Sequence, residues 1–228
     1  MVSKNAIKRA LSNPLFTVKT AIYYLLFKDD VGYLRKQLAT RYSERDIKNF
    51  SIGASVGLKE VAIYLIVRKF KPRFMVETGV ANGISTYFIL KAMDDNGFGR
   101  LISIDLPNYN KKGYITSEGT CDGVYIPKEY KPGWVVPAPL TKRWSLLLGK
   151  SKEKLPTING KIDAFYHDSE HSYDNMMFEF EWAYSHLKAG GILLADDTNR
   201  NSAFTNFCRK YNDKARRLKL PISCAIKK

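Results

Sequence analysis

Residues 74–90 read FMVETGVANGISTYFIL, and this stretch decides the fold. It opens with a short apolar run that ends at Glu77, which is typical of a buried strand and too short for a helix. Gly79 and Gly83 follow, and apolar residues at helical spacing begin near Ser85. A strand, a glycine-bearing turn and a helix in this order predict the front half of a βαβ unit.

The glycines suit a turn beside a ligand, because the chain must reverse tightly there and bare backbone can be approached closely. The free N–H groups at the start of the helix also favour an electron-rich or anionic group. Any buried strand followed by a loop would give a similar glycine pattern. The next apolar run, RLISID at residues 100–105, ends in a second carboxylate. In nucleoside-binding sheets such an acid accepts hydrogen bonds from ribose hydroxyls, so Asp105 predicts adenosine between two strand ends.

The pattern Glu77-x-Gly79-x-x-x-Gly83-x-Ser85, followed by Asp105, resembles the first two motifs of class I S-adenosylmethionine (SAM) methyltransferases. It is similar to the variant in the catechol and sugar O-methyltransferase branches, whereas the dehydrogenase fingerprint Gly-x-Gly-x-x-Gly is absent. The resemblance implies a Rossmann-like, doubly wound, mostly parallel seven-stranded sheet with helices on both faces and an N-terminal helical extension. It also implies that these five residues bind SAM.

The length and composition indicate one catalytic domain with a strong positive charge. The chain has 228 residues, is 45% hydrophobic and 26% charged, and carries a net charge of +15. Such a charge implies attraction to a phosphorylated or nucleotide-linked substrate, to nucleic acid or to an acidic membrane, although solubility alone would also account for it. The three cysteines, Cys121, Cys208 and Cys224, show neither pairing nor metal-ligand spacing, which favours a reducing compartment.

Residues 1–50 form a basic, helix-prone extension to a methyltransferase domain that we place at residues 51–228. A basic amphipathic segment can lie on an anionic membrane, or its apolar face can pack on the domain or on a partner chain. Peripheral membrane contact and homo-oligomerisation therefore both stay open. No apolar run reaches the length of a membrane span, and the run at 21–27 lacks a signal-peptide cleavage site, so we expect a cytoplasmic protein.

Residues 106–142 are irregular and rich in proline and aromatic residues. They follow a strand end, where sheets of this type bind ligands, so they are candidates for lining an acceptor pocket; a self-packed surface loop is the alternative. Residues 144–149, WSLLLG, predict the third strand. The resemblance implies that Gly149 and Ser151 contact the adenine ring, while Ser151 could equally be a helix N-cap.

Two further strands are predicted, over residues 162–168 and 192–195, with a helix between them over 175–187. The glycines in residues 188–191 are expected to stop that helix. Because the carboxyl ends of parallel strands meet at one edge of a sheet, the polar residues that follow these strands should lie beside the acids of the first two strands.

Three aspartates, Asp168, Asp196 and Asp197, follow the fourth and fifth strands. Carboxylates brought together repel one another unless a cation neutralises them, and oxygen ligands favour a hard ion such as Mg²⁺. These positions match the magnesium ligands of metal-dependent O-methyltransferases, and the resemblance therefore implies a magnesium site. Alternatively, Asp168 serves the cofactor and the Asp196–Asp197 pair caps a helix or binds solvent.

The resemblance also suggests the base that removes the acceptor's proton. In the catechol branch it lies three residues after the first metal aspartate, which is His171 here, and in sugar enzymes an acid two residues after it, here Glu170, has this role. A histidine titrates near neutral pH, which favours His171. Alternatively, His171 only orients Asp168 or Tyr173.

The sequence thus predicts a SAM-dependent O-methyltransferase, with or without Mg²⁺, for a hydroxylated small-molecule or glycan acceptor of anionic character. The block from His167 to Phe204 also resembles a widespread bacterial and archaeal group of class I methyltransferases. The chain lacks the Asn/Asp-Pro-Pro-aromatic motif of enzymes that methylate base nitrogens, which argues against nucleic acid. The alternatives are an enzyme of the cephalosporin hydroxylase type and a non-catalytic basic adaptor on a methyltransferase-like scaffold.

Overall fold

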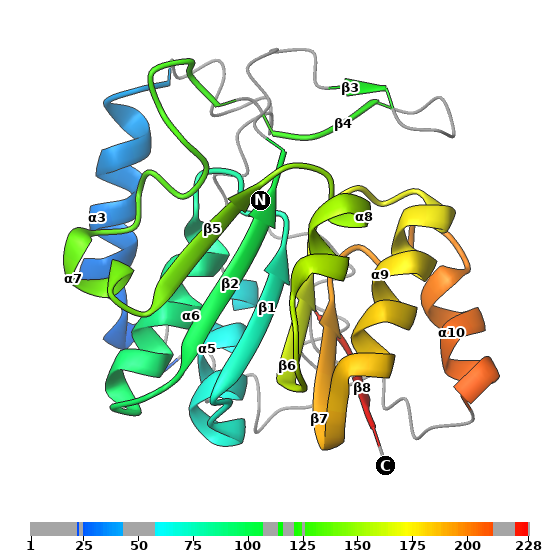
Figure 1. The fold of residues 1–228 in the computed structure, drawn as a ribbon. Coiled ribbons are helices and arrows are strands. Elements are labelled where there is room, and N and C mark those ends of the chain that lie inside the picture. The colour runs from blue at the N-terminus through cyan, green and yellow to red at the C-terminus, as the bar shows by residue number, and fades with distance from the viewer. Residues whose placement is uncertain are drawn as a thin grey trace.

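The structure is a computed structural model that describes residue 22 and residues 25–42, 58–106, 114–115, 121–124, 126–211 and 222–227. A six-stranded sheet with the order β5-β2-β1-β6-β7-β8 forms its centre (Figure 1). The strands are β1 (Phe74–Thr78), β2 (Arg100–Asp105), β5 (Trp144–Leu148), β6 (Ile162–His167), β7 (Leu187–Ala195) and β8 (Ser223–Ile226). Only β8 pairs antiparallel within this sheet. The expected mostly parallel α/β sheet is confirmed, and the described residues contribute six of the seven strands that we expected.

The strand order places a topological switch point at the centre of the sheet. The chain runs outward from β1 through β2 to β5 and then returns to β6, which pairs with the other side of β1. The connection after β1 leads to β2 on one side, and the connection after β6 leads to β7 on the other side. In open α/β sheets, ligands bind beyond the carboxyl ends of the strands at such a point.

Helices cover both faces of the sheet (Figure 1). One face carries α3 (Lys28–Ala39), α5 (Leu58–Phe70), α6 (Ile84–Asp95) and α7 (Ala138–Thr141). The other carries α8 (Ser151–Lys154), η1 (Leu155–Thr157), α9 (Tyr173–His186) and α10 (Ala203–Tyr211). Each face of the sheet has its own hydrophobic core, the first under α3, α5 and α6 and the second under α9 and α10. Neighbouring residues of β1 divide between these cores, since Met75 belongs to the first and Val76 to the second. This alternation follows from the two-residue repeat of a strand and explains why β1 is apolar on both faces.

Helix α3, which comes from the predicted N-terminal extension, packs into the first core. Its residues Val31, Leu34 and Leu38 are buried there. The side chain of Tyr87 in α6 donates a hydrogen bond to Asp30 of α3. The described part of the extension therefore packs against the sheet domain, and the domain boundary at residue 50 stays a prediction. The basic residues before position 22 lie outside the described residues.

The junction between α9 and β7 differs from the prediction. The helix ends at His186 and β7 begins directly at Leu187, whereas we expected a glycine stop at 188–191 before a strand at 192–195. Leu187 already pairs with Ile162, and the register then shifts before Ala164. Gly190, with φ of 76°, lies in this irregular start of the strand, where its N–H donates to the carbonyl of Lys227. The glycines thus allow an irregular strand and do not end the helix.

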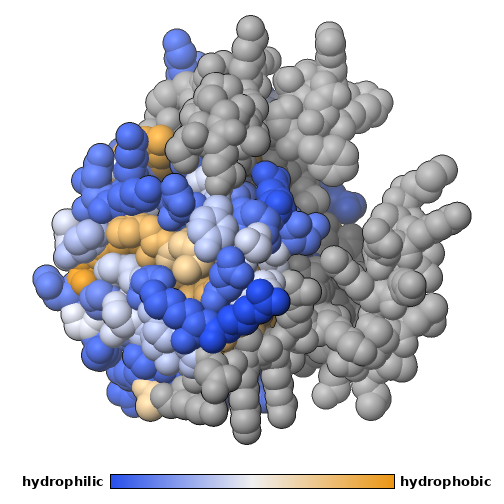
Figure 2. Space-filling view, turned by 90° about the vertical axis from the view of Figure 1, so that its right-hand side faces the viewer, coloured by the Kyte–Doolittle hydropathy of each residue, from blue (hydrophilic) through white to orange (hydrophobic). Residues whose placement is uncertain are grey.

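A short two-stranded ribbon of β3 (Tyr114–Ile115) and β4 (Cys121–Asp122) lies above the carboxyl ends of the central strands (Figure 1). It belongs to the irregular insertion after β2. Figure 2 shows the side of the molecule to the right of Figure 1, where hydrophilic residues border a hydrophobic area. Among the helices in the described part of the chain, none is long and apolar enough to cross a membrane.

Candidate active site

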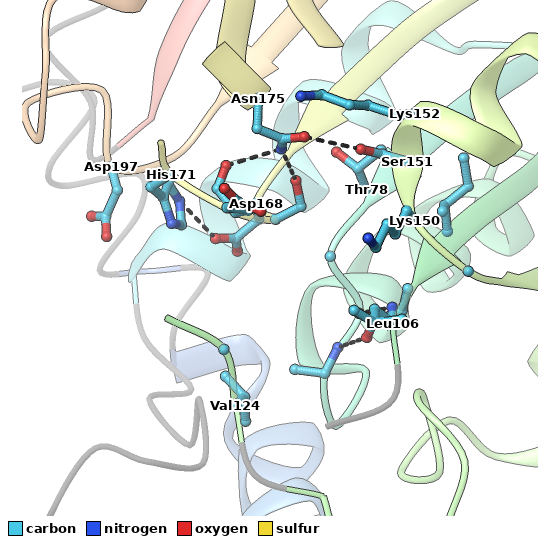
Figure 3. A pocket seen from close by; sticks show the side chains of 18 of the residues that line it. Thr78, Leu106, Val124, Lys150, Ser151, Lys152, Asp168, His171, Asn175 and Asp197 are labelled. Atoms are coloured by element: carbon cyan, nitrogen blue, oxygen red, sulfur yellow. Dashed lines mark hydrogen bonds and ion pairs between the residues drawn. The ribbon is translucent and has the colours of Figure 1, made fainter. Parts of the chain in front are cut away.

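A cavity of about 500 Å³ opens at the carboxyl edge of the sheet (Figure 3). This volume is in the range of small-molecule sites. The sequence-predicted residues that line it are Gly79, Asp105, Gly149, Ser151, Asp168, Glu170, His171 and Asp197. Residues from five strand ends, those of β1, β2, β5, β6 and β7, therefore converge on one cavity, as the parallel topology requires. The other predicted residues, Glu77, Gly83, Ser85 and Asp196, lie behind this lining.

Gly79 stands where the ends of β1 and β6 touch. Its φ is 82°, and a side chain there would bring a Cβ atom within 2.0 Å of the carbonyl oxygen of Asp168. The Asp168 N–H donates to the carbonyl of Thr78 at 2.9 Å, which keeps the two strand ends together. Only glycine combines this conformation with so close an approach. The cavity is therefore open to the backbone at this position.

Asp105 fixes the turn between β1 and α6. Its Oδ2 accepts hydrogen bonds from the backbone N–H groups of Ala81 at 2.7 Å and Val80 at 3.2 Å. Its Oδ1 accepts one from the N–H of Leu106 at 2.7 Å. Burial raises the pKa of Asp105 to about 6, although these hydrogen bonds favour the charged form. The carboxylate lines the cavity with acceptor capacity left for a ligand hydroxyl.

Glu77 lies behind the cavity and joins three elements. Its fully buried carboxylate accepts hydrogen bonds from Ser85 and Thr86 of α6 and from Ser103 of β2, at 2.7 to 2.8 Å. Burial raises the pKa of Glu77 to about 7, against the effect of the three hydroxyl donors. In this position Glu77 and Ser85 hold β1, β2 and the start of α6 together. Their direct contact with SAM stays a prediction.

Gly83 has a packing reason for being glycine. It is the N-cap of α6 with φ of 96°, and a Cβ there would lie 2.6 Å from Cα of Gly133. Gly133 belongs to the insertion after β2, and its N–H donates to the carbonyl of Ala81. The nearby Trp134 donates through Nε1 to Asn82 at 2.7 Å. The insertion is thus anchored on the glycine turn, and Gly83 is not among the residues that line the cavity.

Asp168 and Asp196 meet, as expected, and a lysine lies between them. Lys59 of α5 places Nζ 2.6 Å from Oδ2 of Asp196 and 3.2 Å from Oδ2 of Asp168. Burial disfavours both charged aspartates, but the ammonium outweighs this at Asp196 and lowers its pKa. At Asp168 burial prevails and the pKa is raised. Burial also opposes the charge of Lys59, yet the two carboxylates raise its pKa above the ordinary value.

Asp197 takes a different direction from Asp196. It has φ of 46°, unusual for a residue with a side chain, and its Oδ2 accepts hydrogen bonds from Nε and Nη2 of Arg200 at 2.8 Å. Figure 3 shows Asp197 and Asp168 with the His171 ring between them. Across the part of the chain that the structure describes, no group of three or more acidic, histidine or cysteine side chains could hold a metal. This arrangement does not fit a divalent ion held by Asp168, Asp196 and Asp197.

The two candidate bases line the same side of the cavity. His171 places Nε2 3.8 Å from Oδ1 of Asp168, and Asn201 donates to the backbone carbonyl of His171 at 2.9 Å. Glu170 accepts a hydrogen bond from the hydroxyl of Ser172 at 2.6 Å. Their roles as bases stay predictions, although the carboxylate of Asp168 lies close enough to orient the histidine ring.

Glu179 of α9 organises the floor of the cavity, and our sequence analysis missed it. It is fully buried and accepts hydrogen bonds from Thr78, Ser169 and Asn175, all of which line the cavity. Burial disfavours its charge, but His167, 2.6 Å away, lowers the pKa of Glu179 to about 2. A glutamate on the apolar stripe of a helix was the available signal, because α9 buries residues 176, 179, 180 and 183.

The β5 side of the cavity is basic. Lys150 and Lys152 line it beside Gly149 and Ser151, opposite Asp168 and His171 (Figure 3). The Gly149 N–H donates to the carbonyl of Asp105, which joins the ends of β5 and β2. Ser151 donates to Asn175 at 3.3 Å. The predicted adenine side and the predicted acceptor side thus face each other across one cavity.

Comparison with known proteins decides the enzyme class. A family model described as a methyltransferase domain matches residues 76–198, more than half of the chain. The chain belongs to this methyltransferase family. It is a SAM-dependent methyltransferase. The matched residues run from β1 through the end of β7 and include every lining residue named above except Arg200, so the predicted class is confirmed.

Solved structures show the same fold at low sequence identity. A methyltransferase from Geobacter sulfurreducens is 16% identical with a TM-score of 0.58, covering 87% of this chain and 88% of that one. A Podospora anserina methyltransferase bound to S-adenosylhomocysteine (SAH) is 16% identical, with a TM-score of 0.56 and 87% of each chain covered. An O-methyltransferase from Bacillus cereus in complex with SAH is 14% identical, with a TM-score of 0.53, covering 83% and 94%. Among curated proteins, no sequence matches this methyltransferase.

Proposed function

We propose that this methyltransferase transfers the methyl group of SAM to a hydroxyl oxygen of a small-molecule or glycan acceptor. The observation that carries the proposal is the shared cavity, which is lined by His171 and Asp168 together with Gly79 and Asp105. Two of the solved methyltransferases with this fold are bound to SAH, and one of these is described as an O-methyltransferase. Both observations favour chemistry at an oxygen atom within this cavity.

The cofactor half of the proposal rests on the turn after β1. The cavity volume and its exposed backbone at Gly79 fit a nucleoside-sized ligand. Asp105 would accept hydrogen bonds from the ribose hydroxyls, and the backbone at Gly149 and Ser151 would contact adenine. When bound, SAM supplies a methyl group on a positively charged sulfur. The carboxylates of Asp105 and Asp168 on the cavity wall would stabilise that charge.

The acceptor half rests on His171. Its imidazole would take the proton from the acceptor hydroxyl, so that the oxygen forms the new bond to the methyl carbon while the carbon–sulfur bond breaks toward sulfur. Asp168 would stabilise the imidazolium that results, since the two side chains are 3.8 Å apart. Glu170 lines the same wall and is the second candidate for this base.

The cations of the cavity favour an anionic acceptor. Lys150, Lys152 and Arg200 line it, and the whole chain carries a net charge of +15. Phosphate or carboxylate groups of a sugar, a nucleotide sugar or a lipid-linked glycan would find donors there. Arg200 is shared with Asp197, so an anion at Arg200 would compete with this ion pair.

A methyl-transfer screen tests the proposed function. SAM with a labelled methyl group is offered with free sugars, nucleotide sugars, glycolipids and catechols, and with amines as controls. We expect label on an oxygen atom of an anionic hydroxylated acceptor. Label on amine nitrogen only, or SAM turnover on none of the hydroxylated compounds, would contradict the proposal.

The base is tested with matched histidine variants. His171→Ala should lower kcat by about 100-fold or more with little change in SAM affinity, because proton removal contributes roughly this factor. His186→Ala is the control, since His186 stacks on Trp182 at the end of α9 and does not line the cavity. Equal kcat values for the His171 and His186 variants would exclude His171 as the base, and Glu170→Gln would then be the next variant.

A further inference from the structure

The position between Asp168 and Asp196 contains a cation supplied by the chain. Lys59 is the second residue of α5, and its side chain is only 25% exposed. Its Nζ contacts one oxygen of each aspartate, at 2.6 and 3.2 Å, and lies 3.9 Å from Oε1 of Glu60. The same oxygen of Asp168 also accepts a hydrogen bond from Tyr166 at 2.8 Å. The inner faces of both carboxylates are therefore occupied.

We propose that the Lys59 ammonium takes the place of a divalent metal ion in this methyltransferase, so that its acceptor side functions without bound metal. The second part of this proposal, that the acceptor side functions without bound metal, rests on the function proposed above. The occupation of the carboxylate pair by Lys59 is a structural claim that does not depend on which acceptor is methylated.

The geometry makes lysine and metal alternatives. Mg²⁺ or Mn²⁺ would need carboxylate oxygens at about 2.1 Å in a near-octahedral shell. Those oxygens already accept hydrogen bonds from Nζ, and a divalent ion beside a fixed ammonium would be repelled. The third predicted ligand, Asp197, forms an ion pair with Arg200. The pair of aspartates thus has the positive charge of Lys59 beside it, which neutralises their repulsion in part.

Lys59 is a positioning residue in this arrangement. It is not among the residues that line the cavity, but it holds Asp168 through Oδ2 while Oδ1 faces His171. In a metal-dependent enzyme the ion itself would bind the acceptor oxygen and lower the pKa of its hydroxyl. Here the proton would be removed by the His171–Asp168 pair, whose position depends on Lys59.

A calorimetric titration of the full chain with Mn²⁺ tests the proposal. Wild-type protein should show no saturable Mn²⁺ binding at Asp168 and Asp196. Lys59→Met, which has a similar length and no charge, should gain Mn²⁺ affinity by about tenfold or more, because the competing ammonium is gone. Lys188→Met is the matched control, since Lys188 pairs with Asp163 at 2.6 Å; it should leave Mn²⁺ binding unchanged.

Saturable Mn²⁺ binding by wild-type protein that disappears in Asp196→Asn would overturn the proposal, and this measurement does not depend on the Lys59 variant folding. A folded Lys59→Met variant without Mn²⁺ affinity would also overturn it, because the position would then not be a cation site. SAH binding is measured on the same wild-type sample. Absence of SAH binding would count against the proposed cofactor site. Saturable Mn²⁺ binding together with SAH binding would count only against the proposed role of Lys59.

Discussion

Two pairs of acids lie at the same edge of the sheet and are stabilised in different ways. Glu77 and Asp105, at the ends of β1 and β2, accept hydrogen bonds only from hydroxyl and backbone N–H donors among the described contacts. Burial raises the pKa values of this pair to about 7 and about 6. Asp168 and Asp196, at the ends of β6 and β7, share the ammonium of Lys59, which lowers the pKa of Asp196 against the effect of burial.

The difference separates the two halves of the cavity. Neutral donors fix the Asp105 carboxylate without a countercharge, so it can accept hydroxyl groups from a bound nucleoside. A lysine gives the second pair a permanent partner, so its geometry does not require an ion from solution. Gly79 is the contact between the halves, because its backbone follows β1 and touches the carbonyl of Asp168. Substitutions can therefore affect the halves together or one at a time.

Gly79→Ala should have the largest effect, because it affects both halves. The new Cβ would lie 2.0 Å from the Asp168 carbonyl in a conformation with φ of 82°. We expect a loss of about 4 kcal/mol or more in the free energy of unfolding, measured by urea denaturation, and no SAH binding. Gly97→Ala is the matched control, since Gly97 has φ of 80° and a Cβ atom there would meet no other atom within 4 Å. It should cost about 1 kcal/mol from backbone strain alone. Equal losses in the two variants would contradict the close contact.

Lys59→Met should affect only the second half. It leaves Asp168 and Asp196 without their positive partner, and we expect a loss of about 3 kcal/mol in the free energy of unfolding at pH 7. The lowered pKa of Asp196 contributes stability that is fully present above its ordinary pKa of 3.8 and is lost as the pH falls through the lower folded value, so the loss should shrink only below about pH 4. Lys188→Met, at a more exposed ion pair, should cost less than about 1 kcal/mol. A Lys59 variant as stable as the Lys188 variant would mean that the pair needs no cation.

The convergence of these acids could be predicted from the sequence. Each of Glu77, Asp105, Asp168 and Asp196 follows a short apolar run, and parallel strands end at one edge. The glycine turn was readable for the same reason, because Gly79 and Gly83 separate a strand from a helix.

The partners of the acids could not be predicted in the same way. Lys59 lies on the helix before β1, more than 100 residues from Asp168 and Asp196, and a lysine on a helix is ordinarily a solvent-exposed residue. The direction of Asp197 depends on a positive φ that few residues other than glycine adopt. The start of β7 at Leu187 depends on pairing with Ile162, which the local glycines obscure. Each of these features comes from tertiary contacts between distant parts of the chain.

Glu77→Gln should change how stability depends on pH. The pKa of Glu77 rises from 4.5 to about 7 in the folded protein, so its contribution is full below pH 4.5 and is lost as the pH rises through about 7. Glutamine does not titrate, and the difference between wild type and variant should therefore fall by up to about 3 kcal/mol between pH 4.5 and pH 8. Urea denaturation at several pH values measures it. Glu181→Gln, at the exposed pair with Lys210, is the control, and a constant difference for Glu77→Gln across this range would contradict the burial effect.

The most direct test of the cavity as the SAM site is SAH titration calorimetry with Asp105→Asn and Asp163→Asn. Asp163 is a matched control because its carboxylate also accepts from backbone N–H groups, those of Arg73 and Phe74, at the opposite end of β1. At pH 8 we predict that Asp105→Asn lowers SAH affinity by about 10- to 100-fold, since a hydrogen bond to a charged group is lost. Asp163→Asn should bind SAH like wild type. SAH affinity that is equal in wild type and Asp105→Asn would contradict the account.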